Sequence, residues 1–85
     1  MKNELDSKLI LSAFEKIREN GEKDDGKFLL DGVYATTDFD GYTLFLNDAN
    51  VELQFGFHNQ YHFTYNNEEQ RHQFELKLKR IDENY

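Results

Sequence analysis

The 85-residue chain contains no Cys and no Pro, and it has no long apolar run. Without Cys there is no disulfide, no thiolate metal ligand and no cysteine nucleophile, and this composition fits a reducing compartment. No stretch approaches the roughly 20 apolar residues of a membrane span, and charges on both sides of the apolar residues 9–11 argue against a signal peptide. We therefore expect a cytoplasmic protein that does not enter a membrane.

Basic residues are scarce in the middle of the chain. Residues 27–65 carry five acidic side chains and one basic side chain, Lys27, and the formal net charge of the whole chain is −7. Proteins that bind phosphate backbones need Lys and Arg to displace counterions. We therefore expect no direct contact with nucleic acid, and a basic protein is the partner that this charge favours.

The residues that nucleophilic or phosphate chemistry needs are also few. The two serines, Ser7 and Ser12, are not in a Gly-x-Ser-x-Gly motif, and the five glycines are scattered rather than gathered in a phosphate-binding loop. Carboxylate pairs such as Asp24 and Asp25 lie in turn-like sequence, where burial does not tune a pKa for catalysis. The sequence predicts a protein that is not an enzyme and has no cofactor.

The three histidines, His58, His62 and His72, are the candidate metal ligands. Their spacing matches neither His-Glu-x-x-His nor a Cys/His pattern, so we interpret them as polar surface residues. Residues 38–41, Asp-Phe-Asp-Gly, partly resemble a calcium loop, but Asn47 stands where that loop needs a bidentate Glu. A hairpin turn explains these residues, and we expect no metal site.

Aromatic residues are abundant, and residues 33–65 hold nine of the thirteen in alternating apolar runs. Asp40-Gly41 predicts a type I′ hairpin turn, because both central residues of that turn need positive φ. Two more turns are expected at residues 47–50 and 58–60. The intervening segments predict four strands, at residues 33–38, 42–47, 51–57 and 61–65.

The segment before these strands is harder to assign. Residues 21–26 predict a polar loop with Gly at each end. Residues 28–30 form a short apolar run that is either an edge strand or a buried connector, and periodicity over three residues does not decide between them.

The alternation within the strands separates an apolar face from a polar face. The residues expected on the apolar face are Tyr42, Leu44, Leu46, Val51, Leu53, Phe55, Phe57, Tyr61, Phe63 and Tyr65. The opposite face is expected to carry Thr43, Phe45, Glu52, Gln54, Gly56, His62 and Thr64.

A helix is expected at each end of the chain. Residues 4–20 place an apolar stripe on one side, formed by Leu5, Leu9, Ile10, Ala13, Phe14 and Ile17, and Asn20-Gly21 suits the helix end. Residues 67–84 are also expected to be helical, with Phe74, Leu78 and Ile81 on one stripe. The alternation of residues 74–79 leaves a strand there as the second possibility. Leu11 and Leu76 fall outside both stripes.

These elements predict one α+β domain over residues 1–85. Its order is α-β-β-β-β-α, with a four-stranded antiparallel meander and both helices packed on the same face. The exposed polar face is then the surface on which a function is to be sought.

We expect a non-enzymatic interaction or regulatory module that binds another, basic, protein, as an inhibitor or a nucleic-acid mimic does. The candidate partner-binding residues are Asp38, Asp40, Phe45, Asp48, Glu52, Gln54 and His62. The alternative is a small-ligand-binding domain or minor enzyme with a pocket between helices and sheet. Leu11 and Leu76 are a second candidate contact, and the sequence leaves a monomer and a homodimer open.

Two stretches of the chain read DSKLILSAFEKIRENGEK and LDGVYATTDFDGYTLFL. At these stretches the chain resembles a family of short, uncharacterised bacterial proteins catalogued as a domain of unknown function. The resemblance implies a standalone bacterial protein, and it transfers no activity, ligand or site.

Overall fold

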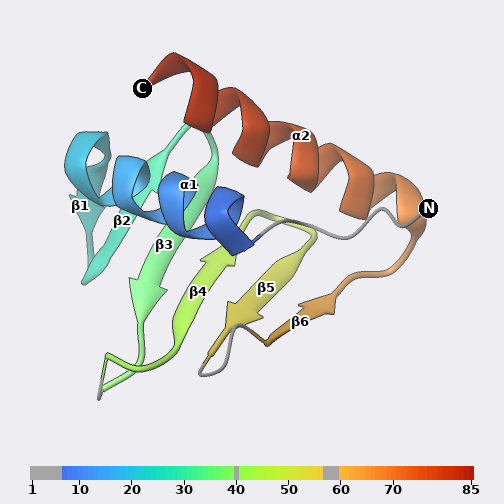
Figure 1. Ribbon diagram of the computed structural model, residues 1–85, viewed down its shortest axis with the longest axis horizontal. Helices are drawn as coiled ribbons and strands as arrows, with labels where there is room; N and C mark the ends of the chain where they lie inside the picture. The colour runs from blue at the N-terminus through green and yellow to red at the C-terminus, as the bar shows by residue number, and fades with distance from the viewer. Residues whose placement is uncertain (1–6, 40, 57–59) are drawn as a thin grey trace.

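The computed structural model describes residues 7–39, 41–56 and 60–85. Its architecture is α+β, with a helix at each end of an antiparallel sheet (Figure 1). The elements in chain order are α1 (Ser7–Asn20), β1 (Glu22–Asp24), β2 (Lys27–Leu30), β3 (Val33–Thr37), β4 (Leu44–Asn47), β5 (Glu52–Phe55), β6 (Tyr61–Thr64) and α2 (Glu68–Asn84).

The sheet has six strands rather than the expected four. The strands pair in the order β1-β2-β3-β4-β5-β6, and every neighbouring pair is antiparallel. The four expected strands correspond to β3–β6, although each is one to three residues shorter than predicted. The prediction of a polar loop at residues 21–26 was wrong, because β1 lies there, and residues 28–30 are strand rather than connector.

Two tight Asp-Gly turns explain the additional strands. Asp25 and Gly26 have φ of 53° and 84°, and Asp31 and Gly32 have φ of 51° and 83°. Each pair joins strands through a two-residue connection, since Asp24 pairs with Lys27 and Leu30 pairs with Val33. Positive φ at both central positions is the requirement of a type I′ turn, which matches the twist of a hairpin.

The Asp40-Gly41 signal does not make the two-residue hairpin that the sequence predicts. The N–H of Asp38 donates to the carbonyl of Thr43 at 3.0 Å, and the N–H of Gly41 donates to the carbonyl of Asp38 at 3.1 Å. The connection between β3 and β4 is therefore longer than two residues. Tyr42 lies in this connection and is 62 % exposed, so its expected place on the buried face was wrong. Asp40 itself lies outside the described residues, as does Phe57.

Helix α1 buries four members of the predicted apolar stripe against the sheet, while Leu9 is half-buried and Leu5 lies outside the described residues. Ile10, Ala13 and Ile17 are fully buried, and Phe14 is nearly so. The helix ends at Asn20, and the N–H of the following Gly21 donates to the carbonyl of Ile17 at 2.8 Å. A Cβ at this position would lie 2.6 Å from the carbonyl oxygens of Ile17 and Leu29, so only Gly allows the chain to pass this closely from helix to strand.

Residues 68–84 are helical and not strand, so the helix preferred from the sequence is present one residue shorter than expected. Asn67 caps α2 by accepting a hydrogen bond from the N–H of Gln70 at 2.9 Å, and Glu68 and Glu69 in the first turn complement the helix dipole. Phe74, Leu78 and Ile81 are fully buried. The Phe74 ring meets the Phe63 ring of β6 edge-on, with centroids 6.2 Å apart.

The buried residues of both helices and one sheet face form a single core, so both helices cover the same face, as predicted. Inward-facing sheet residues that join it include Phe28, Leu30, Val33, Ala35, Leu44, Leu46, Leu53, Phe55, Tyr61 and Phe63. In Figure 1, α1 crosses in front of β2 and β3, and α2 runs beside it in the same direction. The opposite face of the sheet is left without a covering layer of described helix.

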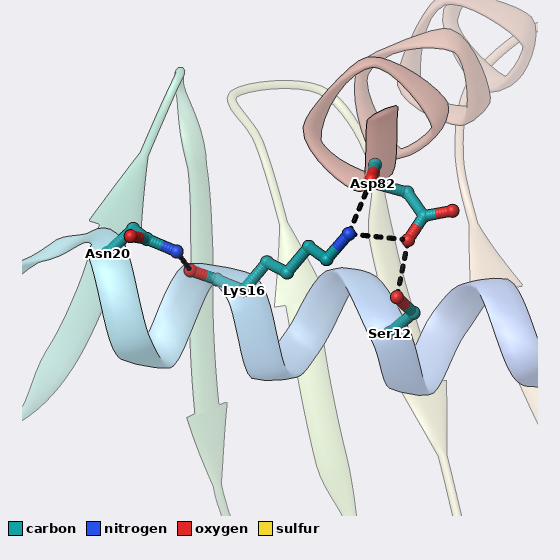
Figure 2. A network of polar contacts seen from close by, with 4 residues as sticks. All are labelled: Ser12, Lys16, Asn20 and Asp82. Carbon is teal, nitrogen blue, oxygen red and sulfur yellow. Dashed lines mark hydrogen bonds and ion pairs between the residues drawn. The ribbon is translucent and has the colours of Figure 1, made fainter. Parts of the chain in front are cut away.

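A polar network joins the two helices outside this core. Ser12 Oγ donates to Oδ1 of Asp82, and Lys16 Nζ lies 2.5 Å from the carbonyl oxygen of Asp82 and 3.3 Å from Oδ1. Figure 2 shows Ser12 and Lys16 extending from α1 toward Asp82 in the last turn of α2. The hydrogen bond from Ser12 lowers the pKa of Asp82, and Lys16 lowers it further, against the opposing effect of burial.

Candidate interaction surface

The uncovered side of the sheet is the candidate interaction surface, called the open face below. Strand alternation places its side chains opposite those of the core. Its members from β2 to β6 are Lys27, Leu29, Tyr34, Thr36, Phe45, Asn47, Glu52, Gln54, His62 and Thr64. Four predicted site residues, Phe45, Glu52, Gln54 and His62, therefore share one face, as the sequence indicated.

Phe45 lies at the middle of the open face. It pairs with Thr36 on β3 and with Gln54 on β5, and Gln54 in turn pairs with His62 on β6. Phe45 is half-buried by these neighbours, whereas Gln54 and His62 are exposed. The result is an aromatic side chain with hydrogen-bonding groups on its β5 and β6 side.

A second row of open-face residues runs beside the first. Tyr34 pairs with Leu29 and with Asn47, and Glu52 pairs with Asn47 and with Thr64. The Nζ of Lys27 lies 5.7 Å from the centre of the Tyr34 ring, so the cation is placed over an aromatic face. Half-buried Leu29 and Tyr34 extend the apolar part of the open face toward β2.

A hollow of about 380 Å³ lies where this row meets the turn between β4 and β5. Lys27, Asn47, Glu52 and Thr64 contribute to its wall, together with residues 48–51 of the turn. Its lining residues include one Lys, two acidic residues, two Asn and one Thr, so the lining is mainly polar. The hollow lies at the rim of the open face and not between helices and sheet, where the alternative hypothesis of a small-ligand-binding domain placed a pocket.

Asp48 does not lie on the open face, because its carboxylate is turned toward α2. Its side chain is only 4 % exposed. Oδ1 accepts hydrogen bonds from the N–H groups of Asn50 and Val51, both at 2.8 Å, and Oδ2 lies 2.8 Å from Nζ of Lys77. Asp48 thus closes the β4–β5 turn and ties it to α2.

The pKa of Asp48 reflects these contacts. Burial alone would raise the pKa, but the hydrogen bonds from Lys77, Asn50 and Val51 and the charge of Lys77 together outweigh burial and lower it. The carboxylate is therefore ionised and fully engaged within the fold, which leaves little of it for a partner.

Asp38 is likewise engaged by its own loop. Its Oδ1 accepts from the N–H groups of Gly41, Tyr42 and Thr43 at 2.8, 3.1 and 3.4 Å. Asp38 and Asp48 lie at opposite ends of β4, so the structure does not gather these two acids into a cluster. Asp40 lies outside the described residues.

Strand β1 adds acidic residues that were not among the candidate partner-binding residues predicted from the sequence. Glu22 pairs with Leu29 and Asp24 pairs with Lys27, so both acids extend the open face beyond β2. The Asp25-Gly26 pair was the sequence signal that would have revealed this hairpin. The acidic side chains thus lie toward the two margins of the open face, with Glu22 and Asp24 on one side and Glu52 on the other.

Within the described residues, no three His, Cys, Asp or Glu side chains come together as metal ligands would. His62 is exposed on β6 and His72 is exposed on α2, while His58 is outside the described residues. In the described part of the chain, no helix is long and apolar enough to cross a membrane.

A family model described as a protein of unknown function (DUF3081) matches residues 5–85. The chain belongs to this family. The match confirms the resemblance noted in the sequence, and DUF3081 membership transfers no activity, ligand or site. No curated protein matches the chain, and no solved structure matches it.

Proposed function

We propose that this DUF3081 protein is a non-enzymatic interaction module that binds another protein through its open face. The observation that supports the proposal is the half-buried Phe45 at the middle of an uncovered sheet face, with Gln54 and His62 beside it. Protein–protein interfaces commonly combine a buried aromatic side chain at the centre with hydrogen-bonding groups, and their charged residues lie at the rim.

The acidic margins make a basic partner the best electrostatic match. Glu22, Asp24 and Glu52 lie toward the margins of the open face, and Lys27 lies opposite Asp24 on β2. Charges at a rim accelerate encounter and select the partner more than they add affinity. The inhibitor or nucleic-acid-mimic version of the proposal therefore depends on these three acids and not on Asp38 or Asp48, whose carboxylates are engaged within the fold.

A cytoplasmic location and a bacterial source complete the proposal. The absence of Cys supports a reducing compartment. The bacterial source follows from the resemblance seen at the two quoted stretches.

The test is a pull-down with the tagged protein, eluted with increasing salt and read by mass spectrometry. Glu52→Gln and Gln54→Arg, both at exposed positions, are expected to lose the same basic protein, with Gln54→Arg reducing its recovery about tenfold or more. Glu83→Gln is the matched control, because Glu83 is an exposed glutamate on α2. Equal recovery by Gln54→Arg and the unmodified protein would refute binding through the open face.

The second candidate function, binding of a small ligand, is supported by the hollow near Lys27. Lys27 and Glu52 face it from two strands, which suits a small molecule that carries both charges. The expected result is an increase in melting temperature with such a metabolite that Lys27→Gln abolishes. A thermal-shift screen in which no zwitterionic metabolite stabilises the protein would remove this candidate.

A further inference from the structure

The two edges of the sheet differ in charge. Strand β1 consists of Glu22, Lys23 and Asp24, all charged and all exposed. Strand β6, at the other edge, carries no formal charge and lies within residues 53–67, fifteen consecutive residues without Asp, Glu, Lys or Arg. Natural proteins use charged side chains on edge strands to prevent unwanted pairing between sheets. Strand β1 has this protection by charge, and β6 lacks it.

The hydrogen-bond pattern shows which backbone groups β6 presents at this edge. The N–H of Gly56 donates to the carbonyl of Gln60 at 2.9 Å. Gly56 and Gln60 therefore form a hydrogen-bonded pair between β5 and β6. Because hydrogen-bonded and non-hydrogen-bonded pairs alternate between antiparallel strands, Gln54 and His62 also form a hydrogen-bonded pair, as do Glu52 and Thr64. The N–H and C=O of Phe63 therefore point away from β5. In the described part of the chain, β6 is the last strand of the sheet on that side.

The same strand is held in place from the core side. The Phe63 ring packs edge-on against Tyr65 and Phe74, with centroids 6.2 Å away in both cases. The guanidinium of Arg71 lies 5.1 Å from the centre of the Phe63 ring. Because β6 is already ordered, pairing with another strand does not include the entropic cost of ordering β6 itself.

We propose that β6 is a dimer interface at which a second copy of this chain pairs antiparallel with it. In the proposed arrangement the two-fold axis passes beside Phe63, so that the two Phe63 residues exchange backbone hydrogen bonds. His62 of each copy then lies opposite Thr64 of the other on the open-face side. Tyr61 lies opposite Tyr65 on the core side, and the two six-stranded sheets become continuous.

Self-complementarity is the reason for choosing a second copy as the occupant. In this register, aromatic residues meet aromatic residues on the core side and neutral polar residues meet on the other, with no like charges opposed. The charged β1 edge offers no such match, because acid would meet acid in most registers. A basic strand from another protein has no carboxylate on β6 with which to pair.

Electrostatics give the dimer a salt dependence opposite to that of the open-face complex. Each copy carries a net charge of −7, and Glu52, Glu68 and Glu69 are the charged residues that flank the neutral stretch containing β6. Added salt screens repulsion between copies, whereas it weakens attraction between the acidic margins and a basic partner. The dimer is therefore expected to strengthen as NaCl is raised toward about 0.5 M, where the Debye length is about 4 Å.

The experiment is sedimentation velocity over about 10 µM to about 1 mM protein, at low and high NaCl. The expected result is a shift from the 10.2 kDa monomer to twice that mass with increasing concentration and salt. On the same samples, the rate of hydrogen exchange at the Phe63 amide is expected to fall at least tenfold as the fraction of dimer increases. A monomer at every concentration and salt would overturn the proposal, as would a dimer in which this amide exchanges unchanged.

Charge variants test the register directly. His62→Lys with Thr64→Lys places Lys opposite Lys across the axis, and it is expected to weaken dimerisation at least tenfold. His62→Glu with Thr64→Lys places Glu opposite Lys across the axis, and within the chain it places Lys opposite Glu52, so it is expected to restore the dimer, which a merely misfolded edge would not do. His72→Lys with Gln73→Lys adds the same charge on the exposed side of α2 and is expected to have no effect. Equal dimerisation of the first two variants would contradict the proposed pairing.

Discussion

The ion pair between Asp48 and Lys77 connects the turn after β4 to the middle of α2. Nζ of Lys77 lies 2.8 Å from Oδ2 of Asp48, whose side chain is buried, while Oδ1 accepts two backbone hydrogen bonds from the turn. One carboxylate therefore holds both a local turn and a long-range contact, because its two oxygens face different elements. This is the polar counterpart of the core contact that Phe74 makes with Phe63.

Removal of the Asp48 carboxylate is expected to destabilise the fold strongly. Asp48→Ala deletes three hydrogen bonds, one of them charge-assisted, and leaves backbone donors and Lys77 unpaired, so we expect a loss of about 2–4 kcal/mol. Asp38→Ala is the comparison, because Asp38 also accepts three backbone N–H groups but in an exposed loop; about 1 kcal/mol is expected. Urea unfolding measures both, and equal losses would contradict the role of burial and of Lys77.

Stability is expected to fall in acid in a way that depends on Asp48. The pKa of Asp48 is lower in the folded protein than its ordinary value of 3.8, so the ionised group stabilises the fold above that value. This contribution is lost as pH falls from about 5 through the folded pKa, because the folded carboxylate must then be protonated. Asp48→Asn is expected to flatten the decline in the free energy of unfolding over this range. An unchanged pH profile in Asp48→Asn would assign the acid sensitivity to other carboxylates, Asp82 among them.

The contact between the two helices is expected to contribute modestly. Asp82→Asn weakens the hydrogen bond from Ser12 and removes the ion pair with Lys16, both partly exposed, so a loss of about 0.5–1 kcal/mol is expected. Glu83→Gln changes the neighbouring exposed carboxylate and is expected to leave the free energy of unfolding unchanged within about 0.3 kcal/mol. Thermal or urea unfolding distinguishes them, and a Glu83→Gln loss as large as that of Asp82→Asn would show that only net charge matters.

Gly21 is expected to tolerate no side chain. A Cβ there overlaps two backbone carbonyl oxygens at 2.6 Å, so the chain between α1 and β1 must move, and Gly21→Ala is expected to cost about 2–3 kcal/mol. Gly56→Ala is the control, because its Cβ would meet only the Thr43 hydroxyl, at 3.9 Å. We expect a change within about 0.5 kcal/mol for Gly56→Ala. Urea unfolding of the two variants decides, and similar losses would disprove the close passage at Gly21.

Much of the fold was predictable because short-range periodicity reports burial. The stripe of Ile10, Phe14 and Ile17 and the stripe of Phe74, Leu78 and Ile81 both predicted helices whose apolar sides are buried. The alternation around Leu53 and Phe55 placed Gln54 on the opposite face. The predicted number of strands was wrong because β1 is too short and too polar to show alternation. The only local signal for its hairpin with β2 is the Asp25-Gly26 turn.

The candidate site was predictable where it depends on which face a strand residue occupies. Phe45, Glu52, Gln54 and His62 follow from alternation alone, and the structure places them together. Asp38 and Asp48 could not be assigned in the same way, because each lies where a strand meets a turn and nothing local indicates where its carboxylate points. The hollow near Lys27 could not be predicted either, because its wall comes from four strands and a turn.

The sequence alone determined the fold class, the two helices and the absence of thiol chemistry. It also determined which residues of the paired strands lie on the apolar and the polar face. Each of these depends on residue type and near-neighbour spacing. The tertiary structure decided which carboxylates remain available. Asp48 is engaged by a lysine 29 residues away, and Asp82 by residues of α1 that are 66 and 70 positions away. Such pairs form only when the core brings the two helices and the β4–β5 turn together. Residue spacing along the chain therefore does not predict them.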